Sequence, residues 1–275
     1  MEENPPYLFL PVLADAPAPR VTVTADVDGA VIDVTVRGDW GPHLGARVAQ
    51  EIGRCLAESP AAILIDAAAV VDPAAESVPV WLSATQIAAA ADPPARLALC
   101  VRSGSALANR LGQIGARRYL SVVNSTAEAR ESLAGHRPLT DVVRLRLPPS
   151  PVSPSVARNL IGGACQAWNL SRLLHPGRAV LSELVSNAVE HARTEMEVSV
   201  SRRGTALHLA VRDRDPTLPR MIDPRPVDPG LPLNERGHGL RVVHADSVAW
   251  GAIPTAGGKL VWATVRDRAG RRRRW

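Results

Sequence analysis

The chain has 275 residues, a length that favours two domains over one. Its apolar content of 46% is sufficient for two hydrophobic cores, but aromatic residues contribute only 3%. The net charge of +5 is uneven: residues 1–150 hold 13 basic and 16 acidic side chains, whereas residues 151–275 hold 19 and 11. Because aromatic residues that could stack on bases are scarce, we expect no direct binding of nucleic acid.

Cysteine usage and hydropathy argue against a disulfide-stabilised, zinc-binding, secreted or membrane-spanning protein. The three cysteines, Cys55, Cys100 and Cys165, are odd in number and widely spaced, which indicates neither a disulfide framework nor a zinc knuckle. The N-terminus lacks the basic segment of a signal peptide, and no apolar run approaches the roughly 20 residues of a membrane helix. We therefore expect a cytoplasmic protein without a membrane-bound segment.

Residues 1–137 are predicted to form a flexible leader and then an α/β domain. Residues 1–19 are rich in Pro and Ala, which is typical of an irregular leader. Apolar patterns then predict strands at 21–24, 31–36, 62–65, 96–101 and 120–123, and helices at about 44–56, 77–90, 104–113 and from 125 onward. This alternation of strands and helices predicts an α/β domain over residues 20–137.

Residues 138–275 are predicted to form a second α/β domain with a basic C-terminal tail. We predict strands at 142–147, 195–202, 205–212, 248–253 and 259–265, and helices at about 153–168, 177–193 and 239–246. Residues 214–236 contain six prolines and are predicted to be an irregular loop. The tail Arg271–Arg274 is expected to be solvated.

One helix of this second domain carries three polar residues at four-residue spacing. Glu183, Asn187 and His191 would form one row along a helix face. The amide oxygen of Asn187 is a hard ligand that Mg²⁺ accepts, and Glu183 could take a proton one turn away. The alternative is that these residues are simply the solvent-exposed side of an amphipathic helix.

Three downstream features favour a nucleotide site over that alternative. Asp213 ends an apolar strand, where its carboxylate could accept a hydrogen bond from an adenine amino group. The run Gly237-His238-Gly239-Leu240 precedes a helix, so its backbone N–H groups could hold phosphate. Lys259, the only lysine of the chain, lies in a hairpin turn after two glycines.

Residues 140–275 resemble the GHKL (Bergerat) ATP-binding domain, in particular the anti-sigma-factor serine kinases. The matching motifs are Glu-Leu-Val-x-Asn-Ala-x-x-His at 183–191, Val-Arg-Asp at 211–213, Gly-x-Gly-Leu at 237–240, Trp-Gly at 250–251 and Gly-Lys-x-Val-Trp-Ala at 258–263. The resemblance implies a Bergerat-type α/β sandwich with helices on one face of a mixed sheet.

It also implies a role for each site residue. Asn187 would carry Mg²⁺, Asp213 would contact adenine, and Glu183 would be the catalytic base. The ATP-binding set would be completed by Gly237, Gly239, Leu240 and Lys259. His191 matches the motif, with packing or hydrogen bonding as its expected role.

The sequence departs from this family at one glycine box. The family has Asp-x-Gly-x-Gly, whereas this chain has Asp213-Arg214-Asp215-Pro216-Thr217. The change removes a close backbone approach, and Pro216 removes an N–H donor. Nucleotide binding is still expected, because related actinobacterial sequences have a similar Asp-x-x-Pro, but catalysis is a separate question.

Residues 20–135 resemble a STAS domain, the fold of anti-sigma-factor antagonists, which implies a mixed sheet with flanking helices. The matching segments are Val36-Arg37-Gly38-Asp39, Ile63-Leu64-Ile65-Asp66, Val71-Asp72 and Leu99-Cys100-Val101. The family has an acceptor serine in the turn after Val71-Asp72, where this chain has Ala74. Ser77 follows three positions later, where a helix N-terminal or surface role is expected.

The loss of the hydroxyl suggests a pseudo-substrate domain that docks on the kinase-like domain. The alternative is a degenerate domain retained for stability or dimerisation.

Together these resemblances imply an ATP-binding, anti-sigma-factor-like regulator. We expect a serine/threonine kinase that uses ATP and Mg²⁺ to phosphorylate a separate STAS antagonist protein in a partner-switching pathway. Its other expected partner is a sigma factor, and a homodimer is an open alternative. The alternative function is a non-catalytic module whose conformation responds to nucleotide.

Overall fold

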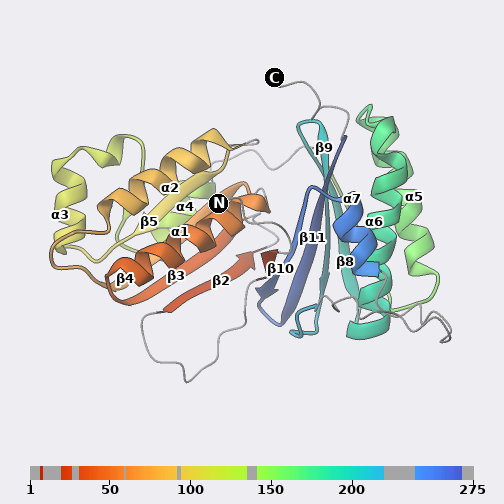
Figure 1. Ribbon diagram of the computed structural model, residues 1–275, viewed down its shortest axis with the longest axis horizontal. Helices are drawn as coiled ribbons and strands as arrows, with labels where there is room; N and C mark the ends of the chain where they lie inside the picture. Colours follow the sequence, from red (N-terminus) through yellow and green to blue (C-terminus); the bar gives the residue numbers. More distant parts are fainter. Residues whose placement is uncertain are drawn as a thin grey trace, which may run out of the picture. The chain divides into compact units, whose positions relative to one another are not determined.

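The computed structural model describes residues 7–8, 20–26, 31–58, 60–91, 94–134, 141–219 and 239–267. Contacts between Cα atoms divide the chain into two units. The N-terminal unit is Leu10–Thr140, and the C-terminal unit combines Met1–Phe9 with Asp141–Trp275. Both units are α/β, as predicted (Figure 1). Among the helices of the described ranges, none has the length and apolar character needed to cross a bilayer.

Within its described residues, the N-terminal unit contains a five-stranded sheet and four α-helices. Its elements are β2 (Arg20–Asp26), β3 (Val31–Asp39), α1 (Pro42–Ala57), β4 (Ala62–Val71), α2 (Val78–Ala90), β5 (Arg96–Cys100), α3 (Ala106–Gln113), β6 (Ser121–Val123) and α4 (Thr126–Ala134). The strand order is β2-β3-β4-β5-β6. The β2–β3 pair is antiparallel and the other pairs are parallel, so the predicted mixed sheet is confirmed.

Helices cover this sheet, whose strands β4 and β5 are largely apolar. α4 buries Ala129 and Leu133 against Leu64 and Ala98. α1 and α2 contact each other and the sheet, and Trp81 of α2 is fully buried. The first four residues of β4 are all buried, and such continuous burial is typical of a parallel sheet with helices around it.

In the part of the C-terminal unit that the structure describes there are a six-stranded sheet and three α-helices. Its elements are β1 (Tyr7–Leu8), β7 (Val142–Leu147), α5 (Ser153–Ala167), α6 (Leu174–Asn187), a π-helical turn (Ala188–Ala192), β8 (Met196–Arg203), β9 (Ala206–Asp213), α7 (Gly239–Asp246), β10 (Ala249–Thr255) and β11 (Gly258–Arg266). The strand order is β1-β10-β11-β9-β8-β7. All pairs are antiparallel except the parallel pair β1–β10, which makes the sheet mixed.

α5, α6 and α7 lie on one face of this sheet (Figure 1), as predicted for the C-terminal half. The core between helices and sheet includes Val180 and Leu184 of α6, Val198 of β8 and Val211 of β9. The ends of the strands form the rim of this layer of helices and sheet. The rim where β9 ends carries Asp213.

The expected flexible leader differs from the structure at Tyr7–Leu8. These residues form β1, which pairs with Gly251 and Ala252 at the edge of the C-terminal sheet. The ring of Tyr7 also stacks on Trp262, with centroids 6.2 Å apart. Periodicity could not indicate this strand, because two residues are too short to show an alternation.

Candidate functional site

Glu183 and Asn187 lie on α6 beside its apolar face. Val180, Leu181, Leu184 and Val185 are buried in the core, which fixes the rotation of the helix. Glu183 and Asn187 are half-buried, whereas Glu190 and His191 are exposed. The expected row of polar residues therefore divides into a half-buried pair and an exposed end. The reading of the whole row as a solvent-exposed side does not account for this pair.

Gly239, the first residue of α7, lies directly against that pair. A Cβ atom built on Gly239 would lie 2.5 Å from Oε2 of Glu183 and 3.4 Å from Oδ1 of Asn187. The structure therefore brings together three predicted site residues from segments about fifty positions apart. Glycine at this position permits the backbone to approach the carboxylate and the amide.

The environment of Glu183 suits a proton acceptor. Burial raises the pKa of Glu183, and the nearby Glu190 carboxylate raises it further. A carboxyl group with a raised pKa is a stronger base once it is deprotonated. Sequence reasoning missed Glu190, although its position seven residues after Glu183, two helical turns along the same face, could have indicated a role.

Asn187 has an unsatisfied polar atom. Its Nδ2 is buried and has no hydrogen-bond partner among the residues that the structure describes. Leaving a buried amide group unpaired costs about 1–3 kcal/mol, so such groups in native proteins call for a physical reason. A polar ligand beside α6 would supply one.

The sequence predicted a helix that continues to about residue 193, but regular α6 ends at Asn187. After Asn187 it widens into a π-helical turn, in which the N–H of Arg193 donates to the carbonyl of Ala188. Arg193 ends the turn in the left-handed region, with φ at 54°. His191 lies within this turn and is exposed, so the regular helical spacing expected from Asn187 to His191 is interrupted.

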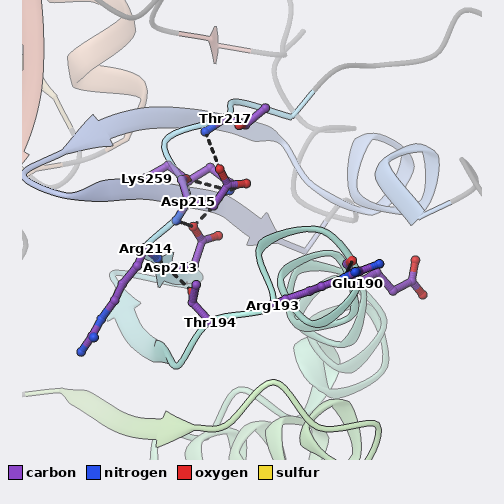
Figure 2. Close-up of polar contacts among 8 residues, drawn as sticks. All are labelled: Glu190, Arg193, Thr194, Asp213, Arg214, Asp215, Thr217 and Lys259. Carbon is purple, nitrogen blue, oxygen red and sulfur yellow. Dashed lines mark hydrogen bonds and ion pairs between the residues drawn. The ribbon is translucent and has the colours of Figure 1, made fainter.

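Asp213 lies at the end of β9, where it is almost fully buried and held by Lys259 of β11 (Figure 2). Nζ of Lys259 donates to Oδ1 of Asp213 at 3.0 Å, to the carbonyl of Asp215 at 3.0 Å and to Oδ2 of Asp215 at 3.2 Å. The backbone N–H of Asp215 also donates to Oδ1 of Asp213. Lys259 and Asp213, predicted separately as ligand-binding residues, are thus an ion pair.

Burial and charge act in opposite directions on these two carboxylates. Burial raises the pKa of Asp213, although the N–H of Asp215 and the Lys259 ammonium oppose it. Burial also raises the pKa of Asp215, but hydrogen bonds from Thr217 and the Lys259 ammonium outweigh it, so its pKa lies below the usual range. Sequence reasoning missed Asp215 as a site residue; its only signal was a second aspartate two positions after Asp213.

A short link joins the end of the π-helical turn to the end of β9. The backbone N–H of Arg214 donates to Oγ1 of Thr194 at 3.1 Å (Figure 2). This bond ties the segment after the turn to the residue that follows Asp213. The Asp213 end of β9 and the Asn187 end of α6 therefore belong to one rim of the C-terminal unit.

The remaining predicted residues have different outcomes. Leu240 is half-buried at the start of α7 and packs against the core. Gly237 lies outside the described residues, as do most of the Pro-rich loop and the basic tail.

In the N-terminal unit the turn after β4 has no accessible hydroxyl. Both carboxylate oxygens of Asp72 accept hydrogen bonds, from the N–H groups of Glu76 and Ser77 and from the hydroxyl of Ser77. Ser77 is the N-cap residue that precedes α2 and is fully buried, so the helix N-terminal role is confirmed and the surface role is wrong. Ala74 has no hydroxyl, and Ser77 is already bonded within the turn.

Comparison with known proteins finds similarity to a family model and to solved structures. Residues 155–265 match the family model described as the histidine kinase-like ATPase domain. A crystal structure of an anti-sigma factor antagonist from Mycobacterium paratuberculosis is similar at 19% identity with a TM-score of 0.37, covering 42% of this chain and 93% of that chain. The search of curated proteins found no match. Residues 155–265, which carry Glu183, Asn187, Asp213 and Gly239, are thus similar to histidine kinase-like ATPase domains.

Proposed function

We propose that the C-terminal unit binds Mg-ATP at the rim formed by α6, the start of α7 and the end of β9. The single observation that supports this most is the packing of Gly239 against Glu183 and Asn187. It places a base, an amide ligand and a helix start within a few ångströms, the set of groups that a phosphate–metal site needs.

The residues at this rim fit both ATP and Mg²⁺. The buried Asn187 amide has an unsatisfied atom that a ligand would satisfy, and its oxygen is of the type that Mg²⁺ prefers. Mg²⁺ would neutralise charge that develops on the phosphate oxygens. Because Gly239 has no side chain, the start of α7 can lie directly beside Glu183 and Asn187. Asp213 would accept a hydrogen bond from the adenine amino group.

We further propose that the protein is a serine/threonine kinase acting on a separate STAS-domain antagonist, in a partner-switching pathway that also involves a sigma factor. The acceptor hydroxyl would form a bond to the γ-phosphorus as the bond to the β-phosphate oxygen breaks. Its proton would pass to Glu183, whose burial raises its pKa. The acceptor comes from another protein in this proposal, since Ala74 lacks a hydroxyl and Ser77 is buried.

A second candidate function is a non-catalytic switch that responds to nucleotide occupancy. It is favoured by Asp213-Arg214-Asp215-Pro216-Thr217, which replaces the glycine box. Pro216 lacks an N–H donor, and the side chain and backbone of Asp215 are already bonded to Lys259. Such a segment is less able to adjust during a reaction.

Two experiments test these proposals. Calorimetric titration with Mg-ATP should show binding to the native chain and a loss of affinity of about tenfold or more in Asn187→Ala. Ser186→Ala, on the same helix, is the matched control and should bind normally. Absence of heat with the native chain would refute nucleotide binding.

The second experiment separates the kinase from the switch. Transfer of labelled phosphate to a STAS antagonist that has its serine should be lost in Glu183→Gln, while Mg-ATP binding persists. A native protein that binds Mg-ATP but transfers nothing would support the switch.

A further inference from the structure

Lys259 is committed to two carboxylates. Its side chain is 8% exposed, and its ammonium has three acceptors, one on Asp213 and two on Asp215. An ammonium has three protons to donate, so these contacts use its full capacity. A role for Lys259 as a direct phosphate ligand would require these contacts to break.

The position of Lys259 follows from the strand register. Lys259 and Asp213 are directly opposite each other in the antiparallel β9–β11 pair. The preceding residue, Gly258, is needed for this approach, because a Cβ atom there would overlap the backbone carbonyl of Asp213. Two independent features, the register and the glycine, therefore bring this one lysine to the end of β9.

The contacts leave the two oxygens of Asp213 in different situations. Both described hydrogen bonds to its carboxylate, from Lys259 and from the N–H of Asp215, reach Oδ1. Within the described residues, Oδ2 has no bond that would compete with a ligand. The Asp213 side chain is 2% exposed, so its rotation is restricted by the surrounding protein.

We propose that Lys259 determines the nucleobase selectivity of the site by fixing Asp213 as an ionised acceptor with one oxygen directed to the ligand. The inference rests on the proposed binding of ATP. Lys259 is a positioning residue: it acts through Asp213 and does not itself contact the base.

The chemistry predicts which bases are accepted. An ionised carboxylate accepts a hydrogen bond from the exocyclic amino group of adenine. Hypoxanthine has a carbonyl oxygen at that position, which would face the carboxylate and repel it. A neutral carboxyl group could donate to that oxygen, so selectivity depends on keeping Asp213 ionised in a buried place. The adjacent ammonium of Lys259 supplies a counter-charge that opposes the effect of burial, which raises the pKa of Asp213.

The test compares the affinities of the full chain for Mg-ATP and Mg-ITP by calorimetry. The native protein should prefer ATP by about tenfold or more, as expected for one hydrogen bond to a charged group. In Lys259→Met the ratio of the affinities for Mg-ATP and Mg-ITP should fall close to one. A folded Lys259→Met protein that keeps the native preference would overturn the proposal.

Two further variants control for charge and for folding. Arg214→Met removes a cation from the same turn, but its side chain is 73% exposed and pairs with Glu195, so the preference should not change. Lys259→Gln removes the ammonium charge, while its amide N–H groups can still donate to Asp213 and Asp215. If Lys259→Met does not fold, Lys259→Gln should show a reduced preference, and a native preference there would overturn the proposal.

A measurement without nucleotide tests the ion pair itself. Because Lys259 is the only lysine, labelling with ¹⁵N-lysine gives one side-chain ammonium resonance in the NMR spectrum. Its protons should exchange slowly with water in the native chain and much faster in Asp213→Asn. Equal exchange rates would refute the pairing.

Failure of the native chain to bind ATP would instead refute the proposed function, whereas equal ATP and ITP binding would refute only the role of Lys259.

Discussion

Gly239 lies against Glu183 so closely that a methyl group on the glycine would be 2.5 Å from Oε2 of the carboxylate. The two residues come from different elements, the start of α7 and the middle of α6. Their contact is the point at which the expected base and the expected phosphate-binding segment meet. Any side chain at position 239 must displace one or the other.

Substitution of this glycine should therefore impair the site. Gly239→Ala is expected to lower the affinity for Mg-ATP by about tenfold or more, since the Cβ atom forces Glu183 or α7 to move. Gly163→Ala in α5 is the control, because a Cβ there meets nothing within 4 Å. That variant should bind normally and be more stable by about 0.4–1 kcal/mol. Normal Mg-ATP binding by Gly239→Ala would contradict the proposed location.

The raised pKa of Glu183 predicts a pH dependence of phosphoryl transfer. A base acts only when deprotonated, so kcat/KM should increase as the pH rises through the raised pKa of Glu183. Burial is the main cause of the shift and the Glu190 carboxylate the second. Glu190→Gln should therefore move the rising limb to lower pH. Glu195→Gln changes another exposed carboxylate and should leave the profile in place.

The same shift predicts a change in stability. The pKa of Glu183 is higher in the folded than in the unfolded chain. The contribution of this side chain to the free energy of unfolding is therefore fully present below its pKa in the unfolded chain. It is lost as the pH rises through the folded pKa. Glu183→Gln should thus have a higher melting temperature than the native protein at neutral pH, and the difference should disappear at low pH. A constant difference across pH would exclude a titration of Glu183.

The Asp72 carboxylate should stabilise the N-terminal unit. It accepts hydrogen bonds from the N–H groups of Glu76 and Ser77 at the start of α2 and from the Ser77 hydroxyl. Asp72→Ala leaves these donors without their acceptor and should lower the free energy of unfolding by about 1–2 kcal/mol. Chemical denaturation measures this, with the exposed Glu131→Ala as control. Equal losses in both variants would show that the turn is not stabilising.

The edge strand β1 should depend on a glycine of its partner strand. A Cβ atom on Gly251 would overlap the backbone carbonyl of Tyr7, so Gly251→Ala is expected to release β1 from β10. The N–H groups of Tyr7 and Leu8 should then exchange faster with deuterium, as measured by mass spectrometry. Gly112→Ala in α3, where a Cβ has open space, should leave their exchange unchanged. Persistent protection in Gly251→Ala would contradict the pairing.

The sequence alone indicated most of the elements, because their patterns are local. Alternating apolar residues located β3 and β7, and the apolar face of residues 180–188 located α6. The residues of the site were also named from their order: Glu183 and Asn187 are one helical turn apart whatever the rest of the chain does. The order of the predicted strands and helices likewise indicated the α/β class of both units.

Tertiary structure decided the features that depend on distant segments. The pairing of Lys259 with Asp213 spans 46 positions and follows from the register of β9 and β11. β1 pairs with β10, and a π-helical turn that regular spacing did not predict follows Asn187. Local propensity fixes which residues share a helix or a strand. Which of them touch across the fold is decided by packing, which the linear order does not contain.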